Sequence, residues 1–416
     1  MECRASVRKL PSASIVENIR FNRTVVVPNA LQGIFKRRPT PVKAATALNV
    51  DGDGAALLAS LRDKHGGLPV WVRVVKDPAL VVLDVADVRR VLEGSPDPFA
   101  ADPAAKRKGM AHFQPDALTI SRGELWRQRR TFADEVLGAA PRERFGAIAQ
   151  EELGGLTAID FDSLHAGFRR LTRRMVLGDA AREDEALSAA LAELMGEANG
   201  LPSDPSPDYG AFAARMEDYV TAGQEGSLAG VATQVEAAPD VRKAGQFTHW
   251  LFATQDTLAV NVLRALALLA AHPDEHDLAG TLQEAMRLWP TTPMLSRETL
   301  KPLAWHQVEV PAGTQVLIVN TFFHRDEIRL GDAAHRFTPE GWAAGGPFVD
   351  DWGLNHFSHG PQGCPGAGLA VHVGVAAMEA VLAAGRPRLE AGGGKLQAGE
   401  RVPHMLDPFA LKLSVG

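Results

Sequence analysis

Helical periodicity recurs along most of this 416-residue chain, and it restricts the fold more than any other feature of the sequence. Runs rich in Ala and Leu place apolar residues three and four positions apart, which is the spacing of one helix face. The pattern predicts a mainly α-helical protein. Its predicted helices span residues 54–64, 85–93, 124–138, 145–153, 163–176, 184–197, 244–271, 278–288 and 367–384.

Strand patterns are fewer and occur in two places. Residues 69–75 and 79–85 are rich in Val and flank Lys76-Asp77-Pro78, which predicts a β-hairpin. Residues 305–310 and 314–320 flank Pro311-Ala312-Gly313 and predict a second hairpin. We therefore expect small peripheral β-sheets beside a helical body.

The sequence contains no linker, repeat or low-complexity tract that would divide it. We expect a single domain over residues 1–416, with a β-rich N-terminal lobe at about 20–85 and a helical body at about 86–416. The helix-poor stretch 95–122 and the Pro- and Ser-rich stretch 201–210 are predicted loops. Long loops inside compact proteins often form lids or binding loops.

Composition excludes several classes of protein. Apolar residues make up 45% of the chain and charged residues 23%, which is ordinary for a globular protein, and the net charge of -6 argues against a nucleic-acid partner. The two cysteines, Cys3 and Cys364, are too few for a disulfide framework and fit a reducing cytoplasm. No stretch approaches the roughly 20 apolar residues of a transmembrane helix. The N-terminal residues lack the apolar core of a secretory signal.

One cysteine occupies an unusual local setting. Residues Phe357 to Gly366 have the sequence FSHGPQGCPG and directly precede a predicted helix. A helix N-terminus presents unpaired N–H groups and a partial positive charge, both of which stabilise a thiolate. From these residues alone, Cys364 is a thiolate ligand, a buried structural cysteine, or a nucleophile with His356 or His359 as its base.

The cysteine loop resembles the heme-binding signature F-x-x-G-x-R/H-x-C-x-G of the cytochrome P450 family. Phe357, Gly360, Cys364 and Gly366 match it at the proper spacing. The resemblance implies that Cys364 is the axial ligand to the iron of heme b, with Phe357 and Gly366 among the cofactor-binding residues. Thiolate ligation favours cleavage of the O–O bond. Gln362 replaces the usual basic residue, so one charged contact with a heme propionate is missing.

Glu284 and Arg287 lie three residues apart in a predicted helix, so their side chains share a face. Taken alone they would be a solvated surface pair. The resemblance implies instead a buried structural pair behind the cysteine loop, usually joined by a downstream arginine. Gly341 stands at the position of that arginine, and Arg336 is the nearby candidate substitute.

Three further residues match positions that contact heme propionates in the family. Arg297 lies in a predicted strand, and its charged fork suits a carboxylate. Trp126 and Arg130 lie four residues apart in a predicted helix and match a W/H-x-x-x-R feature. Each of the three also has an ordinary interpretation as a packed or solvated side chain.

Asp256 and Thr257 interrupt the apolar helix predicted at 244–271. Both are weak helix formers whose polar groups must be satisfied. The resemblance implies that this acid–alcohol pair lies over the distal face of heme and relays protons during oxygen activation. Thr254 stands where the family usually has glycine. A packing role for the pair remains open.

The matches follow the family order along nearly the whole chain. The resemblance implies the cytochrome P450 fold, enclosing heme as a single unit. It also implies a monooxygenase that inserts one oxygen atom from O2 into a small organic substrate by hydroxylation or epoxidation, in specialised metabolism. A separate ferredoxin or flavoprotein would donate electrons. The alternatives are a peroxide-driven or atypical heme-thiolate enzyme (coupling, dehydration, rearrangement) and a heme-binding protein without catalysis.

Overall fold

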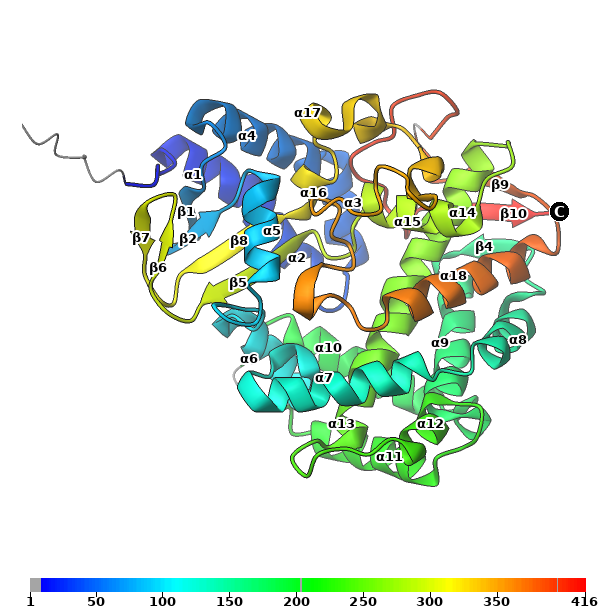
Figure 1. The fold of residues 1–416 in the computed structure, drawn as a ribbon. Helices are drawn as coiled ribbons and strands as arrows, with labels where there is room; N and C mark the ends of the chain where they lie inside the picture. Colours follow the sequence, from blue (N-terminus) through cyan, green and yellow to red (C-terminus); the bar gives the residue numbers. More distant parts are fainter. Residues whose placement is uncertain (1–8, 203, 395) are drawn as a thin grey trace, which may run out of the picture.

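The structure, a computed structural model, describes residues 9–202, 204–394 and 396–416, so Cys3 lies outside the described residues. Helices dominate and strands gather in small sheets, which confirms the expected fold class (Figure 1). The α-helices are α1 (Ile15–Phe21), α2 (Val27–Gln32), α3 (Pro39–Ala47), α4 (Val50–His65), α5 (Val85–Glu93), α6 (Ala104–Phe113), α7 (Gly123–Gly138), α8 (Arg142–Leu153), α9 (Phe161–Leu177), α10 (Glu185–Ala198), α11 (Tyr209–Ala222), α12 (Leu228–Gln234), α13 (Lys243–Phe252), α14 (Ala259–Ala271), α15 (Leu278–Leu288), α16 (Asn320–Phe323), α17 (Glu327–Leu330) and α18 (Ala367–Leu382).

Tighter and wider helical turns connect these helices. The π-helical segments are η1 (Asn22–Val26) and η4 (Ala253–Leu258). The 3₁₀ turns are η2 (Leu118–Ile120), η3 (Asp179–Ala181), η5 (Gly331–His335), η6 (Pro339–Trp342) and η7 (Gly360–Gln362). The strands are β1 (Val70–Val74), β2 (Asp77–Val81), β3 (Phe99–Ala100), β4 (Ala158–Asp160), β5 (Met294–Thr299), β6 (Leu303–Trp305), β7 (Val308–Val310), β8 (Gln315–Val319), β9 (Pro387–Ala391) and β10 (Lys412–Val415).

The largest sheet has the strand order β1-β2-β8-β5-β3. Strands β1 and β2 pair antiparallel through a two-residue turn, which confirms the first predicted hairpin. The second prediction is wrong, because β7 pairs with β6, whereas β8 joins the large sheet. The reason is a tight turn at His306 and Gln307, whose φ values of 49° and 65° suit a two-residue hairpin. Pro311-Ala312-Gly313 instead connects two sheets.

The expected β-rich content of residues 20–85 is also wrong. Helices α1 to α4 fill most of this segment, and β1 and β2 are its strands. Exposed apolar residues conceal the helical pattern, since Ile15 is 81% exposed and Ile19 is 63% exposed. That residues 1–416 form a single domain stays a prediction.

All nine predicted helices occur, with boundaries shifted by a few residues. Helices α6, α11 and α12 were not predicted, and α6 lies inside the stretch 95–122 that was expected to be a loop.

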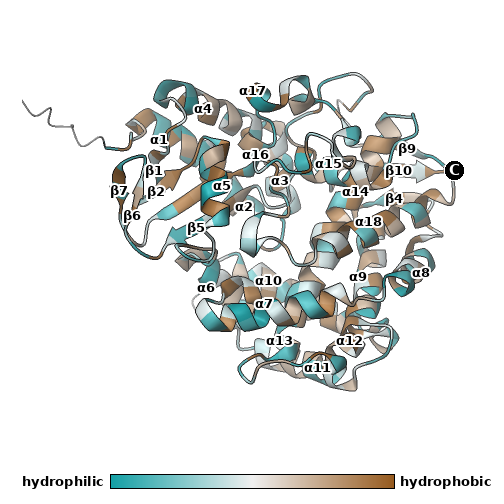
Figure 2. Cartoon of the chain, viewed as in Figure 1, coloured by the Kyte–Doolittle hydropathy of each residue, from teal (hydrophilic) through white to brown (hydrophobic). Residues whose placement is uncertain are grey.

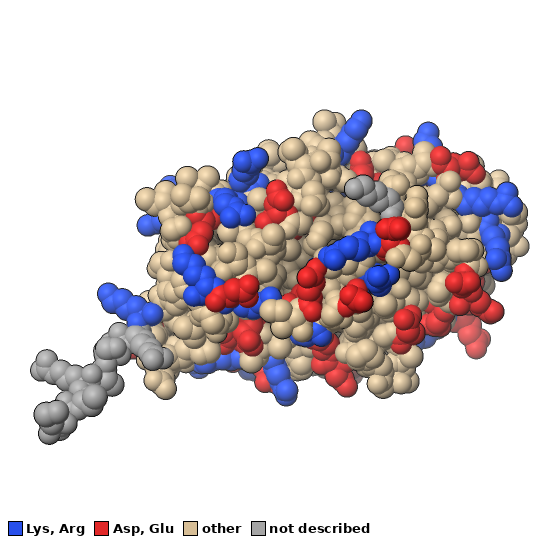
Figure 3. Space-filling model, turned by 90° about the horizontal axis from the view of Figure 1, so that it is seen from above, with Lys and Arg blue, Asp and Glu red and all other residues tan. Residues whose placement is uncertain are grey.

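Figure 2 shows hydrophobic residues on β1 and β2 and mixed colours along α7, whose Phe132 and Val136 are buried. On the face seen from above, acidic and basic side chains interleave (Figure 3). Every described helix is too short or too polar to span a bilayer.

The helix predicted at 244–271 is continuous but changes its winding in the middle. Helix α13 passes into the π-helical segment η4 and then into α14. Asp256 and Thr257 lie within η4. Such wide turns inside α-helices are frequent at functional sites. The π-helical segment therefore contains the two residues that the sequence nominated.

The segment before α18 lies at the centre of the molecule. In Figure 1 it passes, in orange, between the large sheet and α18, above α7. Turn η7 contacts α5, and α18 packs against α8 and α15. Elements from distant parts of the chain thus surround the cysteine loop.

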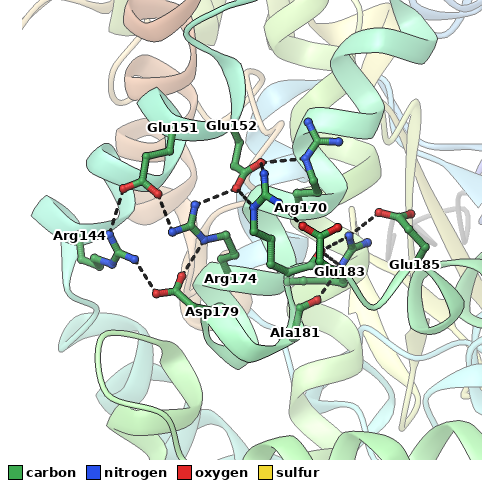
Figure 4. A network of polar contacts seen from close by, with 11 residues as sticks. Arg144, Glu151, Glu152, Arg170, Arg174, Asp179, Ala181, Glu183 and Glu185 are labelled. Carbon is green, nitrogen blue, oxygen red and sulfur yellow. Dashed lines mark hydrogen bonds and ion pairs between the residues drawn. The ribbon is translucent and has the colours of Figure 1, made fainter.

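A buried ionic cluster joins α8, α9 and α10 (Figure 4). The side chain of Glu152 is only 1% exposed and accepts hydrogen bonds from Arg170, Arg174 and Arg182. Burial disfavours the charge of Glu152, but these hydrogen bonds outweigh it and lower its pKa to about 2. The carboxylate is therefore the shared acceptor of three guanidinium groups.

We predict that Glu152→Gln lowers the free energy of unfolding by about 3 kcal/mol, because it leaves three arginines around a neutral side chain. Since the folded-state pKa lies below the ordinary value of 4.5, the contribution of this carboxylate is present above pH 4.5 and is lost as the pH falls towards 2. Urea unfolding at neutral pH measures the loss. Glu124→Gln, in the exposed pair with Arg127, is the control. Equal losses in both variants would contradict the prediction.

Candidate functional site

Backbone contacts hold the cysteine loop in one shape. The N–H of Cys364 donates to the carbonyl of Phe357 at 2.8 Å, and the N–H of Gly363 donates to the carbonyl of Gly360 at 2.9 Å. Gly360 has a φ of 69°, and a Cβ there would lie 2.3 Å from the carbonyl oxygen of Leu92. Glycine is therefore required at this position by both backbone conformation and space.

The thiol of Cys364 is exposed at the end of the loop. Burial by the surrounding protein still raises its pKa, against a backbone hydrogen bond from Gly366 and the charge of Arg130. Gly366 caps α18, so the sulfur lies at a helix N-terminus, as the sequence predicts.

Arg130 and Trp126 lie on α7, beneath the loop. Arg130 donates to the carbonyls of Pro361 at 3.0 Å and Gly363 at 2.7 Å, and its Nε pairs with Asp134 at 2.7 Å. It therefore braces the residue that precedes the cysteine. The partly buried Trp126 lies one helical turn earlier.

Arg297 approaches the loop from the large sheet. It is 4% exposed, and its donors reach Ser95 Oγ at 3.0 Å, the carbonyl of Ser296 at 3.0 Å and Ser358 Oγ at 3.5 Å. Burial lowers its pKa to about 10. These partners are neutral, so this buried cation lacks a counter-charge among the described residues.

Lys106 on α6 is a second interior cation. Burial, followed by the charge of Arg297, lowers its pKa to about 7, and its ammonium donates to the carbonyl of Ala101 at 2.9 Å. The neighbouring Asp102 is bound by Arg107 and Arg122. Two interior cations whose direct hydrogen-bond partners are neutral match the two propionates of heme, and an accessible thiol at a helix N-terminus matches its iron. These residues fit the group.

Glu284 and Arg287 form a fully buried ion pair, with Arg287 Nε 2.7 Å from Glu284 Oε2. Burial raises the pKa of Glu284, but the charge and hydrogen bonds of Arg287 outweigh this and lower it below its usual value. Arg336, the nearby candidate, does not substitute for the missing arginine. Its carbonyl accepts from Arg287, whereas its guanidinium extends to the exposed carbonyl of Gly399.

Neutral groups complete the ion pair in place of an arginine. Trp342 Nε1 donates to Glu284 Oε2 at 3.0 Å, and the Thr338 hydroxyl donates to Oε1 at 3.0 Å. A Cβ at Gly341 would lie 2.4 Å from the ring of Phe348, which in turn lies under the guanidinium of Arg287. The Phe348 ring thus fills the space beside Gly341 that a larger residue would need.

A short chain of hydrogen bonds connects this pair with the cysteine loop. Arg287 Nη1 donates to the carbonyl of His324, and His324 Nδ1 donates back to the carbonyl of Arg287. His324 Nε2 then accepts the N–H of Asn355 at 3.1 Å, and the Asn355 carbonyl accepts the N–H of Ser358. The buried pair therefore supports the loop from behind.

Asp256 and Thr257 lie on η4, which contacts α9 and α18. Asp256 Oδ1 is 3.0 Å from His165 Nε2, and its Oδ2 accepts from Gln255 Nε2 at 3.0 Å. Thr254, like Thr257, is partly buried. Sequence patterns do not reveal that His165 contacts Asp256 or that Lys106 is interior, because both features arise only in the folded chain.

Comparisons with known proteins find similarity to cytochromes P450. The Cytochrome P450 family model matches residues 278–384. Cytochrome P450 714C3 of rice (Oryza sativa subsp. japonica) is 26% identical over 173 residues, which is 33% of this chain and 34% of that protein. Cytochrome P450 81Q32 of Catharanthus roseus is 26% identical over 328 residues, 60% of this chain and 64% of that protein.

A solved structure, retinoic acid bound cyanobacterial CYP120A1, is similar with a TM-score of 0.66 at 17% identity. The match covers 86% of this chain and 94% of that one. Residues 278–384 thus match the Cytochrome P450 family, and the chain has the fold of the cyanobacterial CYP120A1 structure. The chain matches about a third of the length of rice P450 714C3.

We predict that Glu284→Gln lowers the free energy of unfolding by about 3–5 kcal/mol, because it leaves the Arg287 guanidinium uncompensated in the interior. The heme content of the purified protein should fall as well, since the pair supports the cysteine loop. Chemical denaturation and the heme-to-protein absorbance ratio measure the two effects. Glu93→Gln, in an exposed pair with Arg89, should change the free energy by less than about 1 kcal/mol. A stable, heme-replete Glu284→Gln protein would contradict this role.

Proposed function

We propose that this chain is a heme-thiolate monooxygenase that transfers one oxygen atom from O2 to a small organic substrate. The observation that carries the proposal is the exposed thiol of Cys364, which lies at the N-terminus of α18 in a loop that Gly360 and Arg130 hold in shape. Cys364 would hold the iron, and Trp126, Arg297, Phe357 and Gly366 would contact the rest of the heme. Heme with a thiolate ligand supplies the chemistry that activates oxygen.

The chain's own residues tune and hold the site. Burial raises the pKa of Cys364, and the Gly366 N–H and the charge of Arg130 oppose this rise by favouring the thiolate, which is the form that binds metal. Arg297 and Lys106 are the interior cations available for the propionates, and Lys106 offers a charge that Gln362 lacks. Arg130 braces the loop through two carbonyls.

Proton delivery is assigned to Asp256 and Thr257. The Asp256 side chain is 30% exposed, so it can exchange protons with solvent. The neighbouring hydroxyl of Thr257 can pass a proton onward from the same wide helical turn. This intact pair favours O2 over peroxide as the oxidant. A ferredoxin or flavoprotein electron donor, a cytoplasmic location and a role in specialised metabolism stay predictions.

Spectroscopy of Cys364→Ser tests the ligand assignment. We expect the reduced CO complex of the wild-type protein to show a strongly red-shifted Soret band, because thiolate sulfur donates electron density to the iron. The variant should lose this band, since its hydroxyl is not a thiolate. Cys3→Ser is the matched control and should keep it. Retention of the band in Cys364→Ser would refute the assignment.

Coupling between reductant and product tests the proton role. Thr257→Ala should keep its heme and consume reductant, but yield several-fold less product per electron pair because a hydroxyl on the proton route is lost. Product and peroxide are quantified against reductant with a reconstituted electron donor. Thr233→Ala, at an exposed hydroxyl on α12, is the control. Wild-type coupling in Thr257→Ala would count against the relay.

A further inference from the structure

A histidine from α9 contacts the acid of the acid–alcohol pair. His165 Nε2 lies 3.0 Å from Asp256 Oδ1. The His165 side chain is 12% exposed and that of Asp256 is 30% exposed, so the histidine lies on the more buried side of the contact. The two residues are 91 positions apart in the chain, and only the packing of α9 against η4 brings them together.

Aromatic packing fixes the orientation of the imidazole. The ring of His165 stacks on Phe161 with centroids 5.1 Å apart and an interplanar angle of 18°. Phe161 is in turn packed against Phe409, at 4.5 Å. Stacked rings of this kind restrict rotation about the side-chain bonds. The Nε2 atom of His165 therefore points towards Asp256 before any substrate arrives.

Both oxygens of Asp256 have a donor. Gln255 Nε2 donates to Oδ2 at 3.0 Å, and the Gln255 side chain is buried. Both donors act on a residue in the wide turn of η4, where the backbone departs from α-helical winding. The carboxylate is thus held by one neighbour on its own element and by one from α9.

We propose that His165 is a positioning residue that orients the Asp256 carboxylate for proton delivery. This inference rests on the proposed oxygenase function. An arginine or lysine here would be a permanent charge that holds the carboxylate ionised. A histidine donates one hydrogen bond and carries no obligatory charge, so Asp256 is oriented but remains free to take up a proton from solvent and pass it towards Thr257.

Two substitutions of His165 separate orientation from bulk. His165→Phe keeps a ring that stacks on Phe161 but removes the hydrogen bond to Asp256. His165→Gln keeps an N–H donor without the ring. We expect His165→Phe to reduce product formed per electron pair about three-fold or more, with substrate affinity from spectral titration unchanged. We expect His165→Gln to recover at least half of that loss. His372→Phe, at a histidine bonded to the backbone of Arg142, is the control.

A double variant tests whether the two residues act through one contact. If His165 works only through Asp256, adding His165→Phe to Asp256→Asn should cause no further loss of coupling. Additive losses would overturn the proposal. Full coupling in His165→Phe would also overturn the proposal that His165 orients Asp256. In either case, coupled turnover by the wild-type enzyme would leave the proposed oxygenase function standing. A wild-type protein that never turns over with an electron donor would instead count against the proposed function.

A readout independent of turnover examines the contact directly. In the reduced CO complex, with ¹⁵N-labelled histidine, the Nε2–H of His165 should exchange slowly with water because Asp256 accepts it. The signal is assigned by its absence in His165→Phe. It should exchange at least ten-fold faster in Asp256→Ala, which removes the acceptor. A signal that is unchanged by Asp256→Ala would refute the hydrogen bond on which the proposal depends.

Discussion

The buried ion pair of Glu284 and Arg287 is the interaction on which the central region depends. Both side chains are fully buried, and such charges are costly unless their hydrogen-bonding capacity is used. Arg287 donates hydrogen bonds to Glu284 and to the carbonyls of His324, Ala333 and Arg336. One guanidinium therefore fastens α15 to two later segments. Through His324 the same connection continues to the cysteine loop.

This chain completes the pair in its own way. Where the family resemblance leads one to expect a second arginine, Gly341 leaves room for the Phe348 ring, which lies beneath Arg287. Trp342 and Thr338 supply the hydrogen bonds to Glu284 that the arginine would have given. An aromatic face against Arg287 and neutral donors to Glu284 thus complete the ion pair without adding a net positive charge to the interior.

The spacing of apolar residues in the sequence predicted the helices that bury one apolar face. The helices with a strong apolar stripe were found, and so were the helix that carries Glu284 and the helix that begins after Cys364. The turn at His306 and Gln307 was missed, because neither residue is one of those that usually mark a tight hairpin turn. Helices α1 and α2 were missed because their exposed apolar residues blur the pattern.

Contacts between distant residues lie beyond such a prediction. His165 carries no motif, and its meeting with Asp256 follows from the crossing of α9 and η4. Lys106 falls in a stretch that was expected to be a loop. The sequence could therefore nominate Cys364 and Asp256 by resemblance, but it could not supply the groups that orient or balance them.

The buried arginines differ in whether carboxylates of the protein lie near them. Carboxylates oppose the lowering of the pKa at Arg264, where Asp51 and Asp407 are near, and at Arg325, where Glu284 and Asp51 are near. At Arg297 burial acts alone. Because an uncompensated interior cation is unfavourable in the isolated chain, it persists only where a negative group completes it. Arg297 lies beside Ser358 of the cysteine loop, at the place where a heme propionate would supply that charge.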